Sequence, residues 1–156
     1  MSIKGADIRN IAVIGHSGEG KTSVVEAILF NGGTTDRLGK VTDGNTVTDC
    51  DEQEIARKMS ISLSMAYTMW DGVKLNLLDV PGFYDFEGEE NEALRAAGGA
   101  LIVTGATGTL TVGAEKAIDK CLKNKIPMVV FINGVDKYNA EYAGTVAALK
   151  EKYAGK

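Results

Sequence analysis

The sequence has few cysteines, few prolines and no long apolar run, and these scarcities exclude several classes of protein. Only Cys50 and Cys121 among the 156 residues are cysteines, and they lie far apart, so a framework of disulfides is excluded. Two reduced thiols are typical of a cytosolic protein, and we expect a cytoplasmic location. No apolar stretch reaches the length of a membrane span, and residues 1–10 contain no signal-peptide core. We therefore expect no membrane partner.

Positive charge is not in excess either. The 17 Lys and Arg residues face 21 Asp and Glu residues, so the net charge of −4 argues against a broad surface for nucleic acid. A local basic patch stays open. With 19 glycines against two prolines, the composition favours tight loops between regular elements. The length suits one globular domain over residues 1–156.

Apolar periodicity predicts strands and helices that alternate along the chain. Continuous apolar runs or strict alternation predict strands at residues 10–15, 61–69, 74–80, 100–103 and 128–132. Apolar residues at helical spacing predict helices at residues 21–30, 87–97, 114–122 and 142–153. Asp71-Gly72 is typical of a tight hairpin, and the aperiodic residues 34–58 predict a long loop. The pattern predicts an α/β fold with a mostly parallel sheet and one antiparallel hairpin strand.

The strongest motif lies between the first predicted strand and the first predicted helix. Residues 15–22 read GHSGEGKT and fit G-x-x-x-x-G-K-[ST], the phosphate-binding P-loop. Lys21 can reach the β- and γ-phosphates, and the Thr22 hydroxyl can bind Mg²⁺. His16, the only histidine, is expected to have a structural role in the loop. The alternative is a chance glycine turn with a surface lysine. The residues expected to contact the nucleotide here are His16, Ser17, Gly18, Glu19, Gly20, Lys21, Thr22 and Ser23.

Two weaker motifs follow later strands. The first is Asp-Val-Pro-Gly, which begins at Asp79. Asp79 can hold Mg²⁺ through water, and the N–H of Gly82 can sense a γ-phosphate. The segment is also compatible with an ordinary turn.

The second motif contains Asn133 and Asp136, which follow the last predicted strand. A carboxylate there can accept hydrogen bonds from the N1–H and N2–H₂ of guanine, which adenine lacks, and Asn133 can hold this loop against the P-loop. Because open α/β sheets bind ligands where their strands end, the motifs predict one nucleotide site.

Together these motifs resemble those of the translational GTPases, and most closely elongation factor G and its paralogues. The resemblance covers residues 9–136. It includes DVPGFYDF at residues 79–86, and residues 49–61 match the family pattern D-x-x-E-Q-E-x-x-R-G-I-T-I without a gap. The resemblance implies a three-layer P-loop NTPase fold, GTP or GDP with Mg²⁺ as ligands, and the ribosome as partner of a full-length protein.

The resemblance also implies roles for individual residues. Residues 34–58 become the first switch, Ser60 joins Thr22 and Asp79 at Mg²⁺, and Lys21 and Gly82 serve catalysis. Glu52, Gln53 and Glu54 could form an acidic ligand cluster, but a solvated face of a mobile loop is the simpler expectation.

Three positions depart from the family pattern. Gly18 replaces the aspartate of the P-loop, Phe83 replaces the histidine that positions water, and Gly134 replaces the lysine of NKxD. The family's last base-binding motif, a Ser-Ala pair, has no counterpart here, so we expect a GTP-binding domain that stops before that motif. We expect guanine-nucleotide binding with slow GTP hydrolysis. The alternative is a non-hydrolysing GTP/GDP-binding regulatory module, and Asp136 argues against an ATP-using protein.

Overall fold

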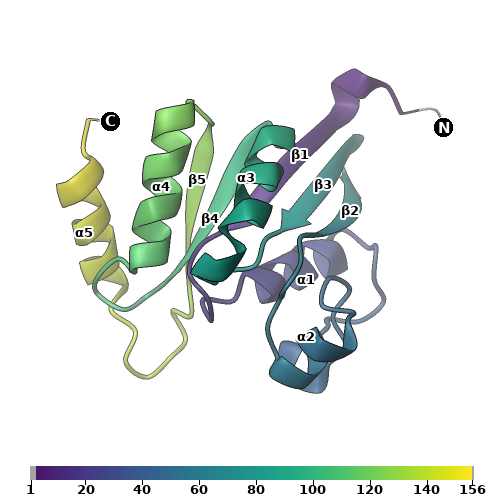
Figure 1. Ribbon diagram of the computed structural model, residues 1–156, viewed down its shortest axis with the longest axis horizontal. Helices are drawn as coiled ribbons and strands as arrows, with labels where there is room; N and C mark the ends of the chain where they lie inside the picture. Colours follow the sequence, from purple (N-terminus) through teal and green to yellow (C-terminus); the bar gives the residue numbers. More distant parts are fainter. Residues whose placement is uncertain (1–2, 156) are drawn as a thin grey trace.

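A five-stranded sheet with the order β2-β3-β1-β4-β5 organises the chain (Figure 1). The computed structural model describes residues 3–155. β1 pairs in parallel with β3 and β4, β4 pairs in parallel with β5, and β2 runs antiparallel to β3 at one edge. The mostly parallel sheet with one antiparallel strand is therefore confirmed. The strands are β1 (Ile8–Ile14), β2 (Ser64–Trp70), β3 (Val73–Asp79), β4 (Gly99–Gly105) and β5 (Met128–Asn133).

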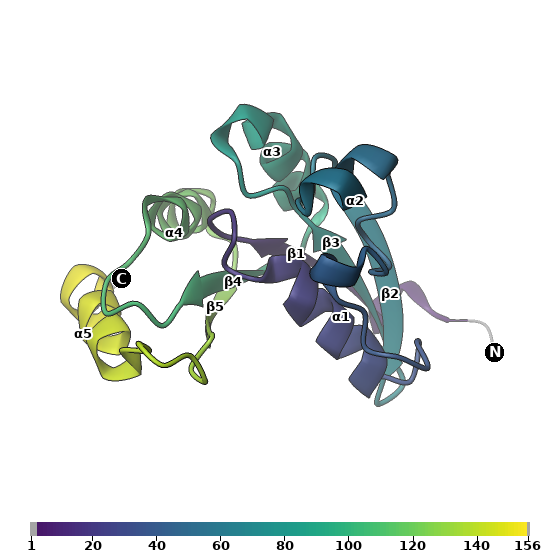
Figure 2. The same ribbon diagram turned by 90° about the horizontal axis from the view of Figure 1, so that it is seen from below.

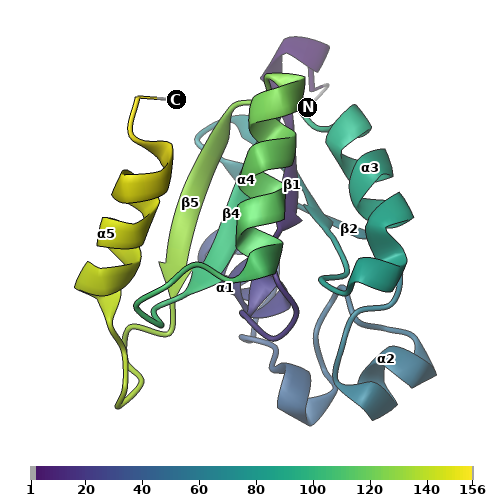
Figure 3. The same cartoon turned by 60° about the vertical axis from the view of Figure 1, so that its left-hand side comes forward.

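Helices cover both faces of this sheet. Figure 2 shows α1 on one side of the sheet and α3 and α4 on the other, and Figure 3 shows α5 beside α4. Each face has its own buried core: Val25 and Leu29 of α1 pack on one face, and Ala93 and Ile118 of α3 and α4 pack on the other. The three-layer arrangement is confirmed. The helices are α1 (Lys21–Asn31), α2 (Glu52–Arg57), α3 (Glu87–Ala96), α4 (Val112–Asn124) and α5 (Tyr142–Tyr153).

The hairpin between β2 and β3 forms as expected. Asp71 and Gly72 have φ angles of 47° and 79°, and two positive angles are what a type I′ turn requires. β2 alternates between faces, but its small residues Ala66 and Thr68 are the buried ones, while Tyr67 is half exposed. Because α1 contacts this side of β2, small side chains fit beneath the helix.

The expectation of an irregular loop over residues 34–58 is wrong in part. This segment contains a short 3₁₀ turn at Val41–Asp43 and the helix α2. Asp51 caps α2 by accepting a hydrogen bond from the N–H of Gln53, and the Glu54 side chain accepts one from the N–H of Asp51. A helix of six residues is too short to show a hydrophobic period, which explains why the sequence pattern does not reveal it.

The carboxyl ends of the four parallel strands meet at one edge of the sheet, and the three motifs lie there. On the α1 side, β4 and β5 are only partly covered. An apolar cavity of about 590 Å³, lined by Ile28, Leu101 and Phe131 among others, lies between α1 and these strands.

Within residues 3–155, no helix is long and apolar enough to cross a bilayer.

Candidate nucleotide site

The P-loop forms the tight connection between β1 and α1 that its glycines allow. A Cβ atom at Gly15 would collide with the carbonyl oxygen of Val103, and one at Gly20 would collide with the side-chain amide of Asn133. Gly20 is also the N-cap of α1, with φ of 89° in the left-handed region. Glycine is thus required here for space and for backbone conformation. The result is a loop that presents its N–H groups and the start of α1 to the same side.

Lys21 is buried beneath this loop. Its ammonium group donates a hydrogen bond to the carbonyl of His16 over 2.9 Å. Burial lowers the pKa of Lys21, while the nearby carboxylates of Asp79 and Glu19 oppose that shift. A cation in a poorly solvated position exerts a stronger field than one in water, so Lys21 is suited to an anionic ligand.

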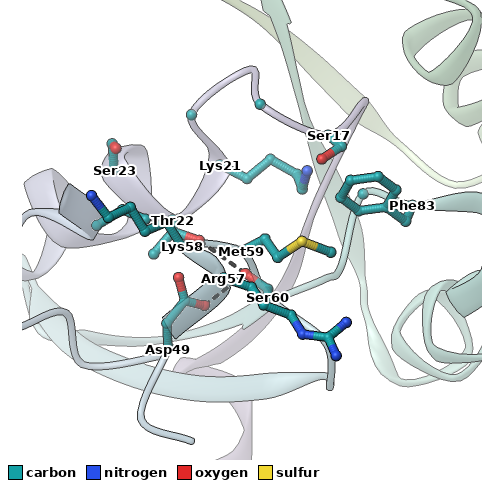
Figure 4. Close-up of a pocket in the computed structure, with 14 residues that line it drawn as sticks. Ser17, Lys21, Thr22, Ser23, Asp49, Arg57, Lys58, Met59, Ser60 and Phe83 are labelled. Atoms are coloured by element: carbon teal, nitrogen blue, oxygen red, sulfur yellow. Dashed lines mark hydrogen bonds between the residues drawn. The ribbon is translucent and has the colours of Figure 1, made fainter. Parts of the chain in front are cut away.

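Hydroxyl and carboxyl groups from distant segments meet beside Thr22. The Thr22 and Ser60 hydroxyl oxygens lie 3.2 Å apart, and Ser60 donates to Asp49 over 2.7 Å (Figure 4). Thr48 donates to Asp79 over 2.7 Å. The structure therefore brings together Thr22, Ser60 and Asp79, the three residues expected at Mg²⁺.

The two aspartates of this group are almost fully buried, and each keeps one oxygen without a hydrogen-bond partner in the described part of the chain: Oδ2 of Asp49 and Oδ1 of Asp79. Burial raises the pKa of Asp79 to about 6, against the opposing hydrogen bonds from Thr48 and Thr22. Burial also raises the pKa of Asp49. Unpartnered buried carboxyl oxygens are costly, and a cation offsets that cost.

The donor set fits magnesium better than a transition metal. Hydroxyl and carboxyl oxygens are the hard ligands that Mg²⁺ prefers, and Mg²⁺ is commonly held by one or two carboxylates together with phosphate oxygens and water. Between residues 3 and 155 there is no cluster of three or more His, Cys, Asp or Glu side chains suited to a metal. The residues thus suit an ion that arrives with a nucleotide.

A cavity of about 390 Å³ lies between the P-loop and residues 34–60. Residues 34–58 are called the first switch below, after the family segment that they resemble, and Ser60 follows directly after them. Figure 4 shows Thr22, Ser60 and Asp49 together on one side of this cavity and Phe83 near Ser17 and the ammonium end of Lys21. A Cβ atom at Gly82 would collide with that ammonium group. Gly82 therefore lies directly against the P-loop, and Phe83, which is 41% exposed, follows it at the cavity wall.

The segment after β5 reaches the P-loop from the other side. The Asn133 side chain donates to the backbone carbonyl of Glu19 over 2.8 Å, so the two loops are connected. Asp136 is exposed. Gly134 has φ of 72°, and the methylene groups of Lys137 lie where a side chain of Gly134 would project.

The remaining P-loop residues differ in their surroundings. The Glu19 carboxylate accepts hydrogen bonds from the N–H groups of His16 and Gly105, which fixes the loop to the end of β4. Gly18 and Ser23 line the cavity and are exposed. The His16 ring lies near Tyr84, with 6.1 Å between ring centroids.

Three charged residues at the cavity were not predicted from the sequence. Asp49 is the first residue of the matched segment 49–61, and its place there was the available signal. Arg57 and Lys58 also line the cavity. Figure 4 shows the Lys58 ammonium group on the side of Ser23 and the Arg57 guanidinium group pointing away from the P-loop. The expectation that residues 52–54 form a solvated face is wrong for Glu54, which is 3% exposed.

Fold and site together define a P-loop nucleotide-binding domain in which Val41, Asp49 and Lys58 line the same cavity as the P-loop. A family model described as the elongation factor Tu GTP binding domain matches residues 6–156, and the chain belongs to this family.

Individual relatives with sequences similar to this chain include an elongation factor G-like protein and a ribosome-releasing factor. It is 37% identical to an elongation factor G-like protein of Mycobacterium tuberculosis over 149 residues, which are 96% of this chain and 21% of that protein. It is 38% identical to the mitochondrial ribosome-releasing factor 2 of Drosophila willistoni, over 94% of this chain and 20% of that protein. A crystal structure from Thermus thermophilus matches with a TM-score of 0.87 at 34% identity, over 95% of this chain and 22% of that chain.

The chain spans about a fifth of the length of the relatives it matches. The similarity therefore concerns the GTP-binding domain of these larger proteins.

Proposed function

We propose that this domain binds GTP and GDP together with Mg²⁺ and hydrolyses GTP slowly. The observation that carries the proposal is the convergence of Lys21, Thr22, Ser60 and the buried Asp49 on one cavity. The buried Asp79 lies next to this group and forms hydrogen bonds with Thr22 and Thr48. Phosphate oxygens need a cation and N–H donors, and a magnesium ion needs oxygen ligands; the two sets lie side by side here.

The residues have separate tasks in this proposal. The P-loop N–H groups and Lys21 hold the β- and γ-phosphates, while Thr22 and Ser60 hold Mg²⁺, with Asp49 and Asp79 orienting its water ligands. When bound, the ion neutralises charge on the phosphates. Gly82 offers its N–H beside Lys21, at the position expected for a γ-phosphate. Asn133 and Asp136 bind the guanine base.

A second candidate is a GTP/GDP-binding regulatory module without hydrolysis. The observation that favours it is Phe83, which stands at the cavity wall where the family has its water-positioning histidine. A phenyl ring offers no hydrogen bond to an attacking water, and hydrolysis depends on positioning that water. Measured turnover distinguishes the two candidates.

For a full-length protein we propose the ribosome as partner, by analogy with the named functions of the relatives. The proposal of this partner rests on similarity to larger proteins and not on any surface of the domain. We propose the cytoplasm as location because both cysteines are free thiols.

Calorimetry of GDP binding with Mg²⁺ tests the proposal. Lys21→Ala removes charge-assisted hydrogen bonds to phosphate, so the dissociation constant should rise roughly tenfold to a hundredfold or more. Lys123→Ala, an exposed lysine on α4, is the matched control and should bind like the wild type. Equal GDP affinity in the wild type and Lys21→Ala would refute the assignment of the phosphate site.

A further inference from the structure

The first switch is attached to α1 by a carboxylate that lies outside the cavity lining. Glu26 of α1 is 1% exposed. Its Oε2 atom accepts a hydrogen bond from the N–H of Gly39 over 3.1 Å, and its Oε1 atom accepts one from the N–H of Val47 over 2.6 Å. Both donors belong to the first switch. A buried carboxylate is stable only when its oxygens are paired, so this side chain fixes two points of the switch to the helix.

The attachment continues residue by residue toward the hydroxyl groups of Thr22 and Ser60. Glu26 holds Val47 by a hydrogen bond to its backbone. Thr48, the residue after Val47, donates a hydrogen bond to Asp79 of β3. Asp49, the residue after Thr48, accepts a hydrogen bond from Ser60. Three consecutive residues are thus bound to α1, to β3 and to Ser60. Release of the first contact would free the segment that holds the other two.

The surroundings of Gly39 are shaped for this contact. Gly39 is buried, and a Cβ atom there would collide with the Glu26 carboxylate. The φ angle of Gly39 lies outside the left-handed region, so glycine is needed here for space and not for backbone freedom. The contact can therefore be disrupted from either partner.

The other end of the switch is held in the same way. The Glu54 carboxylate accepts hydrogen bonds from the N–H groups of Ile61 and Ser62, which directly follow Ser60. Ser60 thus lies between two segments that buried carboxylates hold by their backbone.

We propose that Glu26 is a positioning residue of the nucleotide site, which fixes the first switch so that Ser60 meets Thr22. It acts through the switch backbone. Among the described residues, its side chain forms hydrogen bonds with Gly39 and Val47, and with neither the P-loop nor the hydroxyl groups of Thr22 and Ser60. The inference rests on the proposed function, because its consequence is that Mg²⁺-dependent recognition of the γ-phosphate depends on Glu26.

Two substitutions test the contact from its two sides. Glu26→Gln keeps the size of the side chain, but an amide has one acceptor oxygen and one donor NH₂ group. The N–H of either Gly39 or Val47 would therefore face a donor in place of an acceptor. Gly39→Ala displaces the carboxylate without changing it. The matched controls are Glu151→Gln on α5, an exposed residue, and Gly5→Ala, where a Cβ atom meets nothing within 4 Å.

The first measurement is hydrogen exchange of residues 36–50 without nucleotide. Loss of a charge-assisted hydrogen bond should reduce protection about tenfold or more in Glu26→Gln and in Gly39→Ala, and leave it unchanged in both controls. Because the two substitutions disrupt one contact, their effects should not add. Protection in the double variant should equal that in whichever single variant is less protected.

The second measurement separates positioning from general support of the fold. The ratio of affinities for a non-hydrolysable GTP analogue with and without Mg²⁺ should fall about tenfold in both variants, whereas GDP affinity in EDTA should change less than about twofold. An equal loss in both quantities would overturn the positioning role. If Glu26→Gln does not fold, Gly39→Ala decides the question by the same criteria.

The remaining outcomes are distinguishable. A wild-type protein that binds no GDP would overturn the proposed function and this inference with it. A wild-type protein that binds GDP, with variants that keep both the protection and the Mg²⁺ ratio, would overturn the inference alone.

Discussion

The hydroxyl oxygens of Thr22 and Ser60 lie 3.2 Å apart although 38 residues separate them in the sequence. Thr22 belongs to the first turn of α1, and Ser60 lies two residues after the end of the first switch. Two hydroxyl groups at this distance can share one cation, so the position of the switch and the presence of the ion are coupled. The ion should therefore favour the switch conformation described here.

Replacing the switch-side hydroxyl tests this coupling. In Ser60→Ala the Mg²⁺-dependent gain in affinity for a non-hydrolysable GTP analogue should fall about tenfold, because one ion ligand is lost. Titrations with and without Mg²⁺ measure it. Ser60→Thr keeps the hydroxyl and should behave like the wild type. A Ser60→Ala protein with the full Mg²⁺ effect would remove Ser60 from the ion site.

The buried Asp79 predicts a pH dependence of the metal-free protein. Burial raises the pKa of Asp79 from 3.8 to about 6, so the folded state holds this proton more tightly than the unfolded state. The free energy of unfolding should therefore decrease as the pH rises from about 4 to about 6 and change little from this group above that. A difference of about two in pKa corresponds to roughly 3 kcal/mol.

Urea denaturation of the nucleotide-free, Mg²⁺-free protein at pH 5 and pH 7.5 measures this effect. Asp79→Asn should remove the contribution, so the variant should gain stability relative to the wild type at pH 7.5 and gain less at pH 5. Because the pKa of Asp49 is also raised, the comparison between the variant and the wild type is the informative one. A variant that is equally destabilised at both pH values would contradict the prediction.

The sequence predicted the sheet, the helices α1, α3, α4 and α5, and the glycine-rich loop between β1 and α1, because apolar periodicity and glycine spacing follow directly from backbone geometry. It did not reveal what holds the first switch. Glu26 is a charged residue of an ordinary helical pattern, and Glu54 lies in a segment without an apolar period. The burial of both depends on N–H donors such as those of Val47 and Ile61. Those donors turn inward only once the switch has folded, and hydrophobic patterns carry no signal for backbone donors.

Phe83 predicts slow hydrolysis. Phosphate release by the isolated domain should be on the order of 10⁻⁴ s⁻¹ or slower, as for an unassisted P-loop GTPase. Phe83→His introduces a group that can orient water and should raise the single-turnover rate by about tenfold or more. Phe83→Leu, which adds no polar group, should leave the rate unchanged. Phosphate release within seconds by the wild type, without any partner, would refute the role assigned to Phe83.

Gly134 predicts weak binding of the base. In the resembling family the lysine of NKxD lays its aliphatic stem across guanine, and Gly134 has no such stem. Loss of this contact should cost about 1–2 kcal/mol, which is roughly ten- to thirtyfold in dissociation constant. We therefore expect micromolar or weaker GDP affinity. Asp136 can still pair with the guanine donor pair, so GDP should be preferred over ADP, and Asp136→Ala should abolish that preference.

Gly134→Lys should restore the stem and tighten GDP binding by about that factor. The φ angle of 72° makes a lysine at this position costly, by roughly 1–2 kcal/mol. That strain is present in the free and the bound protein alike, so it should lower the free energy of unfolding and leave the gain in affinity intact. The Lys137 stem must move aside, which a flexible exposed side chain can do. Competition titrations against labelled GDP measure both effects: unchanged GDP affinity in Gly134→Lys would refute the stem contact, and displacement by ADP as effective as by GDP would refute recognition of guanine.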